Sequence, residues 1–265
     1  MKLFDAHTHI QDLRLLNLRD EVIERSVAND VENIMCCGTH EGDWDAVREM
    51  TDKYKPVMAS YGLHPWFIES RSEVWLDRLE ELIKDSSSSV GEIGLDRMIQ
   101  NRNDAEQEKV FIEQLKLAWK YERPVSLHCR KAWGVMPDLI NNNGGLPFGG
   151  VVHSWSGSIE MVKVFEKMGA YISFSGSLTR KNNKKAHRAC KEVSRDRLLI
   201  ETDSPDILPS DIEADLNEPC YIKKVLEKVA EIRGEDISEV AEYTFENSVR
   251  LFGNHTDGQD KNVTI

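Results

Sequence analysis

Residues 4–9, Phe4-Asp5-Ala6-His7-Thr8-His9, decide how the chain is interpreted, because two histidines two apart follow a short apolar run. With Leu3–Asp5 as a strand, the side chains of His7 and His9 point to the same side of the chain just beyond it. Two imidazoles that emerge together can bind one metal ion. Surface histidines or packed histidines would give the same pattern, so the rest of the chain must decide.

The composition fits a large globular protein and limits its partners. The chain has 265 residues, 40% of them hydrophobic, which is ample for one large domain or two small ones. Its formal net charge of −12 argues against wide, nonspecific wrapping of nucleic acid. It does not argue against an enzyme that takes a nucleic-acid end at a metal site, where the cation supplies positive charge. The sequence contains no run of about 18 apolar residues, so it predicts no membrane span.

The cysteines indicate a reducing compartment. They are five in number and form no Cys-x-x-Cys pair: Cys36, Cys37, Cys129, Cys190 and Cys220. The chain also opens directly into an apolar strand, without the basic and apolar regions of a secretory signal. We therefore expect a cytoplasmic protein, or a nuclear one in a eukaryotic cell, and neither a disulfide scaffold nor a zinc ribbon. Cys129 neighbours His128, but no second base is placed to activate it, so we interpret it as structural.

Strand-like and helix-like segments alternate along the chain. The predicted strands are residues 3–7, 31–38, 57–65, 89–96, 125–130, 150–155, 171–175 and 198–203, and the predicted helices cover about 15–29, 42–54, 74–83, 104–121, 131–142, 158–168 and, as the last of two closing helices, 237–252. This count and size predict an α/β fold, a (β/α)8 TIM barrel with two closing C-terminal helices. A doubly wound open sheet is the alternative. We expect one barrel domain over 1–253, a polar tail over 254–265 and a monomer.

Ionisable residues recur near the C-terminal ends of these predicted strands: His7, His9, His64, Glu92, His128, His153 and Asp203. Most of these residues, considered one at a time, could instead be a loop histidine, a core histidine or a residue that caps a turn. Glu92 is different, because a carboxylate in an apolar run rarely stays buried without a cation or several donors. In a barrel all seven would converge on one axis, at the end where barrel enzymes carry their chemistry.

Five blocks of sequence then resemble one family. They are DAHTH at 5–9, GEIGLD at 91–96, SLHCR at 126–130, HSWSG at 153–157 and ETDSP at 201–205. In this order they are similar to the signature blocks of the TatD-type metal-dependent hydrolases, within the amidohydrolase-like barrel superfamily. The resemblance covers residues 3 to about 252, which is nearly the whole chain.

The resemblance implies a site with two divalent metal ions. His7, His9 and Asp203 would hold the first ion, Glu92 would bridge both, and His128 and His153 would hold the second. His64 matches a family histidine expected near the scissile phosphate, and Arg130 is a candidate substrate contact. The ligands are nitrogen and oxygen without thiolate, a set that permits Mg, Mn or Zn.

The chain departs from the family pattern at two places. Ser154-Trp155 stand where relatives usually have Cys-Phe, so Trp155 is either a substrate-binding residue that stacks on a base or a packed aromatic beneath the loop. Arg97-Met98 stand where aromatic residues are common. Both departures bear on substrate preference and leave the reaction type unchanged.

The expected activity is metal-dependent hydrolysis, with Asp203, Glu92 and His64 as catalytic residues. Asp203 would act as general base toward a metal-activated water. As the resemblance implies, the preferred substrate is DNA, single-stranded or at 3′ ends, cleaved by a deoxyribonuclease with 3′-5′ exonuclease character. Basic residues after predicted strands five and seven could guide its phosphates: Arg130, Lys131, Arg180, Lys181, Lys184, Lys185 and Arg188. The alternatives are another ester, an amide, a lactone or an aminoacyl-tRNA ester, or a scaffold with a degenerate site.

Overall fold

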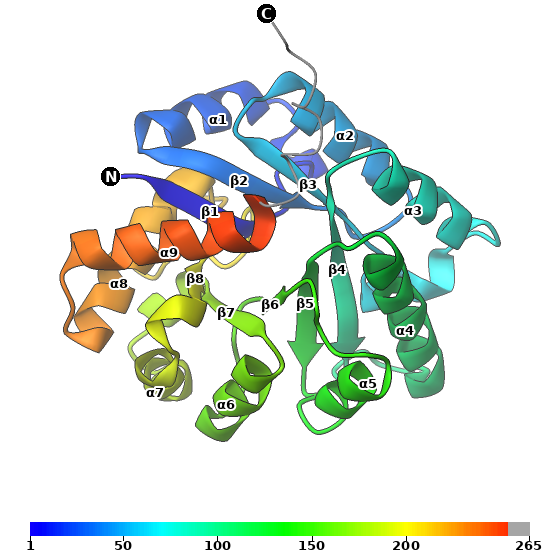
Figure 1. Ribbon diagram of the computed structural model, residues 1–265. Coiled ribbons are helices and arrows are strands. Elements are labelled where there is room, and N and C mark those ends of the chain that lie inside the picture. The colour runs from blue at the N-terminus through cyan, green and yellow to red at the C-terminus, as the bar shows by residue number, and fades with distance from the viewer. Residues whose placement is uncertain (254–265) are drawn as a thin grey trace, which may run out of the picture.

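The computed structural model describes residues 1–253 of the chain. Within them, eight parallel strands form one sheet in the order of the sequence, and helices surround it (Figure 1). The strands are β1 Leu3–Thr8, β2 Val31–Cys37, β3 Val57–Tyr61, β4 Ser89–Asp96, β5 Val125–Arg130, β6 Gly150–Val152, β7 Ala170–Phe174 and β8 Leu198–Ile200. Parallel neighbours in sequence order require a crossover after every strand, and the helices supply it.

The helices form the outer layer because each buries one apolar face against the strands. They are α1 Arg19–Ala28, α2 Trp44–Lys53, α3 Trp75–Lys84, α4 Asp104–Lys120, α5 Met136–Asn142, α6 Ile159–Lys167, α7 Lys184–Glu192, α8 Ile222–Arg233 and α9 Ile237–Phe252. Several begin at side-chain caps: Asn103 accepts from Glu106 N at 3.1 Å, and Asp236 accepts from Ser238 N at 2.8 Å. In residues 1–253, no helix combines the length and the apolar composition needed to cross a membrane.

The sheet closes on itself just beyond β8. Asp203 N donates to His7 O at 3.0 Å, and His9 N donates to Ser204 O at 2.6 Å. These bonds join the segment after β8 to the end of β1, so the strands form a barrel and the open-sheet alternative is wrong. The predicted (β/α)8 fold is confirmed.

Apolar side chains fill the barrel toward the N-terminal ends of its strands. Phe4, Met35 and Val151 belong to this inner cluster, which α9 covers with Leu251 and Phe252 (Figure 1). Phe4 stacks on Phe252 with ring centroids 5.7 Å apart. A second, larger apolar layer lies between the strands and the surrounding helices. Polar residues are thereby left to the other end of the barrel.

Several predicted elements end earlier or begin later than the sequence indicated. The strands predicted over 57–65, 150–155 and 198–203 stop at Tyr61, Val152 and Ile200. Beyond β6 and β8 the chain leaves the extended conformation, with positive φ at Ser154 (43°) and Asp203 (60°). The helices predicted from 15 and from 131 begin only at residues 19 and 136, and part of the basic stretch 180–191 is α7. The predicted tail over 254–265 lies outside the described residues.

Candidate metal centre

The seven ionisable residues predicted from the sequence meet at the C-terminal ends of the strands. His7 lies in β1 with His9 just beyond it, Glu92 lies in β4, His128 lies in β5, and His64, His153 and Asp203 follow β3, β6 and β8. Each of them lies within 4 Å of Glu92 or of the His7 and His9 pair. The barrel therefore brings together residues that are up to 196 positions apart in the sequence, from His7 to Asp203.

Glu92 occupies the middle of the cluster, and its two carboxylate oxygens face different partners. Oε2 lies 3.5 Å from His7 Nε2 and 3.4 Å from His9 Nε2. Oε1 lies 2.8 Å from His128 Nδ1 and 2.8 Å from His153 Nε2. The side chain is almost fully buried, at 3% exposure. One carboxylate thus joins two groups of nitrogen donors.

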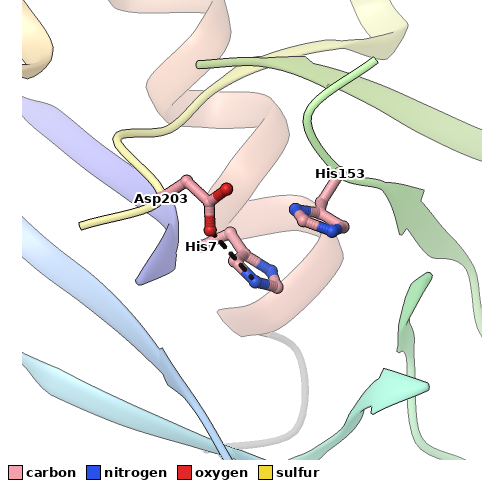
Figure 2. Close-up of side chains that lie close together, drawn as sticks. All are labelled: His7, His153 and Asp203. Atoms are coloured by element: carbon pink, nitrogen blue, oxygen red, sulfur yellow. Dashed lines mark ion pairs between the residues drawn. The ribbon is translucent and has the colours of Figure 1, made fainter. Parts of the chain in front are cut away.

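The first group consists of His7, His9 and Asp203. The Nε2 atoms of His7 and His9 lie 3.2 Å apart, and Asp203 Oδ1 lies 3.9 Å from the former and 3.5 Å from the latter. Figure 2 shows His7 and Asp203 facing each other with the ring of His153 beside them. The rings of His7 and His153 stack with centroids 4.0 Å apart, which links this group to the next.

The second group consists of His128, His153 and His64. His128 Nδ1 and His153 Nε2 lie 3.2 Å apart, and both face Glu92 Oε1. His64 Nε2 lies 3.4 Å from the same oxygen. Lone pairs of two imidazole nitrogens repel at 3.2 Å unless a proton or a cation lies between or beside them. The same holds for the pair of nitrogens in the first group, so both groups present the donor geometry of a cation site.

Backbone and side-chain acceptors behind the histidines fix their orientation. Cys37 O accepts from His9 Nδ1 at 2.8 Å, and His7 Nδ1 lies 2.9 Å from Ser126 Oγ. Because these nitrogens face outward, the Nε2 atom of each ring faces Glu92. Partners of this kind set the tautomer of metal-binding histidines and their basicity.

Two carboxylates that the sequence analysis did not single out serve the second group in the same way. Asp96 Oδ2 lies 3.3 Å from His128 Nε2, and Glu201 Oε1 lies 3.5 Å from His153 Nδ1. Glu201 is buried and also accepts from Ser154 N at 2.8 Å. Asp96 ends the block GEIGLD, and Glu201 begins the block ETDSP. Their position at the ends of apolar strands is the feature of the sequence that could have indicated this role.

His64 differs from the other four histidines in the way its ring is held. Its Nδ1 accepts from Trp66 N at 3.1 Å, so the proton of the neutral ring belongs on Nε2, which faces Glu92. Burial lowers the pKa of His64 to about 4, so the ring is neutral at neutral pH. A neutral ring with a proton on Nε2 is a hydrogen-bond donor to the centre.

The electrostatics of the cluster favour positive charge between the carboxylates. Burial raises the pKa of Glu92, but His64, His153 and the hydrogen bonds from His128 and His153 outweigh it, so the pKa lies well below its usual value. Burial likewise raises the pKa of Asp203, while the hydrogen bond from His9 and the charges of His153 and His7 lower it to about 2. Both side chains are therefore carboxylates at neutral pH. Buried carboxylates among imidazoles meet the condition under which divalent cations bind.

Close backbone approach around Glu92 requires glycine at two positions. A Cβ atom at Gly94, where φ is +150°, would lie 2.0 Å from His128 O. A Cβ atom at Gly62 would lie 2.8 Å from Glu92 O. Only glycine permits these approaches, which hold β3, β4 and β5 together at the centre.

Trp155 does not offer a surface to a substrate. Its side chain is 1% exposed and packs against Trp133, with ring centroids 4.7 Å apart, and against Phe165. The prediction of Trp155 as a substrate-binding residue is therefore wrong, and the packed-aromatic alternative holds, because the loop after β6 folds its indole inward. Arg130 does lie at the mouth, where its side chain is 52% exposed and Nη1 lies 3.9 Å from Asp96.

A buried cluster of imidazoles and carboxylates at the mouth of a (β/α)8 barrel is the site of a metal-dependent hydrolase. The chain belongs to the family described as TatD related DNase, whose model matches residues 4–253. The family resemblance of the five sequence blocks is thereby confirmed.

Relatives agree with this assignment over nearly their whole length. The chain is 35% identical to the uncharacterized metal-dependent hydrolase YabD of Bacillus subtilis, over 94% of this chain and 98% of that one. It is 31% identical to the 3′-5′ ssDNA/RNA exonuclease TatD of Cronobacter sakazakii, over 94% and 97%. The crystal structure of YJJV, a TatD homolog from Escherichia coli K12, superposes with a TM-score of 0.91 at 29% identity, over 95% and 98%.

Proposed function

We propose that this protein is a two-metal nuclease that removes nucleotides from the 3′ end of single-stranded DNA. The observation that carries the proposal is the central position of Glu92, whose Oε2 faces His7 and His9 and whose Oε1 faces His128 and His153. Paired divalent ions are a recurring device for displacement at phosphorus. The name of the Cronobacter relative supports the substrate, and it adds RNA as a second substrate to test.

We divide the donors between the two ions as the family resemblance implies. His7, His9 and Asp203 would hold one ion, His128 and His153 the other, and Glu92 would contact both. His153 also lies close to His7 and Asp203. Two divalent cations, Mg²⁺, Mn²⁺ or Zn²⁺, when bound, supply a water of lowered pKa and neutralise charge on phosphoryl oxygens. No thiolate faces the cluster among the described donors, which suits these ions.

Asp203 is the general base of the proposed reaction. Its carboxylate is ionised and stands at the mouth, so it can accept the proton of the attacking water as the new P–O bond forms. The P–O3′ bond of the terminal linkage then breaks, and the departing O3′ takes a proton from solvent. The products are a strand shortened by one residue with a free 3′ hydroxyl and a nucleoside 5′-monophosphate.

His64 stabilises the phosphoryl group in this reaction. Its Nε2 carries the proton of the neutral ring and points into the centre, so it can donate to an oxygen that gains negative charge. Its Nδ1 is already engaged by Trp66 N, which holds the ring in that orientation. In the proposed reaction His64 acts through this hydrogen bond, although it also lies in a group with Glu92 and His128 that could hold an ion.

Basic side chains beside the mouth support binding of a phosphate backbone. Lys185 Nζ donates to Ser156 O at 2.7 Å, which places the beginning of α7 beside the loop that follows β6. Burial lowers the pKa of Lys185, and the nearby charge of Lys131 lowers it further. Lys131, which follows β5, and Lys185, in the first turn of α7, thus lie near each other beside the loop that follows β6.

The decisive experiment measures the shortening of end-labelled single-stranded DNA from its 3′ end. The protein is stripped with EDTA, then assayed with Mg²⁺, Mn²⁺ or Zn²⁺, beside Glu92→Ala, Asp203→Ala and, as a matched control, the exposed Glu192→Ala. We expect stepwise shortening from the 3′ end that requires metal, disappears in the first two variants and persists in the third. The metal content should be about two ions per chain.

Two other outcomes would contradict the proposal. Metal-loaded protein that leaves DNA and RNA intact but hydrolyses an ester or a lactone would change the substrate class. Protein that binds about one ion per chain and still shortens DNA would overturn the two-metal arrangement around Glu92.

A further inference from the structure

Trp66 is a large aromatic side chain that stays exposed at the mouth of the barrel although its neighbours hold it in place. Its side chain is 57% exposed. Its indole Nε1 donates to Asp96 Oδ2 at 2.7 Å, and its ring meets the ring of His64 edge-on at a centroid distance of 5.2 Å. The hydrogen bond and the edge contact fix the ring, and one large apolar surface remains in water.

Trp66 is also connected to the second group of donors through Asp96. Asp96 Oδ2, which accepts from Trp66, lies 3.3 Å from His128 Nε2 and 3.9 Å from Arg130 Nη1. The indole and the guanidinium therefore flank one carboxylate oxygen directly beside the second group of donors. A planar apolar surface and a cation at this spacing match a nucleotide, which carries a planar base and an anionic phosphate.

The exposure of Trp66 is uncommon within this protein. Among residues 1–253, the other tryptophan exposed to a comparable degree is Trp119, at 41%, on α4. Trp119 lies against Gly144 and donates to Gly145 O, away from the metal centre. Burial of an aromatic ring is favourable, so a ring kept exposed at a catalytic mouth gains that energy when a ligand covers it.

We propose that Trp66 is the platform on which a nucleobase next to the scissile phosphodiester stacks. This inference rests on the proposed nuclease function and specifies its substrate: a single strand whose unpaired bases are free to stack. Recognition is independent of base identity, because every base presents a planar face. Duplex DNA, whose bases are stacked on one another, is a poor substrate unless its end frays.

The test separates stacking from the hydrogen bond to Asp96. Trp66→Ala removes both the ring and the bond, whereas Trp66→Phe removes only the bond. Trp119→Ala is the matched control. Each variant is assayed on three substrates: a single-stranded oligonucleotide, the same oligonucleotide with tetrahydrofuran abasic sites at its last three positions in turn, and methyl p-nitrophenyl phosphate, which has no base.

Stacking predicts a loss that depends on the base. For Trp66→Ala we expect kcat/KM on the normal oligonucleotide to fall roughly 10-fold to 100-fold, mostly through KM. On the diester without a base, and on the oligonucleotide with one particular abasic position, the same variant should match the wild type. Trp66→Phe should keep most of the activity on DNA, and Trp119→Ala all of it.

Other outcomes overturn the inference in distinguishable ways. An equal loss of Trp66→Ala and Trp66→Phe on all substrates would make Trp66 a positioning residue for Asp96. Wild-type protein that cleaves every abasic oligonucleotide at the normal rate would exclude base stacking, whether or not the variants fold. Wild-type protein that hydrolyses the small diester but no DNA would overturn the nuclease function, and the platform with it.

Discussion

At the residue scale, the orientation of each ring in the centre depends on the partner of its outer nitrogen. His128 has Asp96 behind it and His153 has Glu201, whereas His9 has the carbonyl of Cys37. A carboxylate behind an imidazole raises the basicity of the inner nitrogen more than a neutral carbonyl does. We therefore expect Asp96 and Glu201 to make the second group of donors bind its ion more tightly than the first group binds its own.

Glu201→Gln tests that expectation. The substitution keeps the volume of the buried side chain but removes the negative charge 3.5 Å from His153 Nδ1. We expect the affinity for one of the two ions to fall about 10-fold to 100-fold, measured by calorimetric titration of the metal-free protein with Mn²⁺ or Zn²⁺. Glu166→Gln, at a carboxylate that accepts from Ser194 N on the outer layer, should leave it unchanged. Unaltered metal affinity in Glu201→Gln would refute the role of Glu201 in positioning His153.

The thiols provide a second test at this scale. All five cysteines are buried, and burial raises the pKa of Cys129 and of Cys190 to about 12. Because the thiolate is the reactive form, we expect no reaction with Ellman's reagent in the native protein and five thiols per chain in urea. Fast modification of Cys129 in the native protein would contradict its interpretation as a structural residue.

At the element scale, the beginning of α7 brings positive charge to the mouth of the barrel, in a protein whose net charge is negative. Lys181, Lys184 and Lys185 are exposed at or just before its beginning. In a (β/α)8 barrel each helix begins near the end of the strand before it, so these lysines stand on the side of the metal centre. Asn183 caps the helix by accepting from Ala186 N and thereby sets where it begins.

Charge reversal on α7 should weaken nucleic-acid binding. For Lys181→Glu, Lys184→Glu and Lys185→Glu combined, we expect weaker binding of single-stranded DNA and a salt dependence whose logarithmic slope is smaller by about 2. Fluorescence anisotropy measures both, in an Asp203→Asn background that prevents hydrolysis. The control is Lys116→Glu, Lys167→Glu and Lys191→Glu, the same charge change near the C-terminal ends of α4, α6 and α7. Equal effects of the two triple variants would exclude a local role.

At the scale of the whole molecule, the two ends of the barrel have separate tasks. The donors stand at the C-terminal ends of the strands, while α9 covers the other end with Leu251 and Phe252. Barrels of this kind keep chemistry at the first end and stability at the second. The backbone hydrogen bond between Asp203 and His7 serves both tasks, because it closes the barrel and also holds the proposed general base beside a proposed metal ligand.

Phe252→Ala tests this separation. Phe252 is 1% exposed and stacks on Phe4, so its removal leaves a cavity at the covered end. We expect the free energy of unfolding in urea to fall by about 3–5 kcal/mol, while kcat of the folded protein stays at the wild-type level. A loss of kcat in protein that is still folded would show that the two ends are coupled.

The sequence by itself determined the alternation of strands and helices and the seven polar residues at strand ends. Both are local properties, since side-chain periodicity and order along the chain do not depend on distant contacts. Only the tertiary structure decided the closure of the barrel at Asp203, the outer partners Asp96 and Glu201, and the burial of Trp155 and exposure of Trp66. Whether an aromatic is buried or exposed depends on what packs over it, and segments far away in the sequence supply that packing.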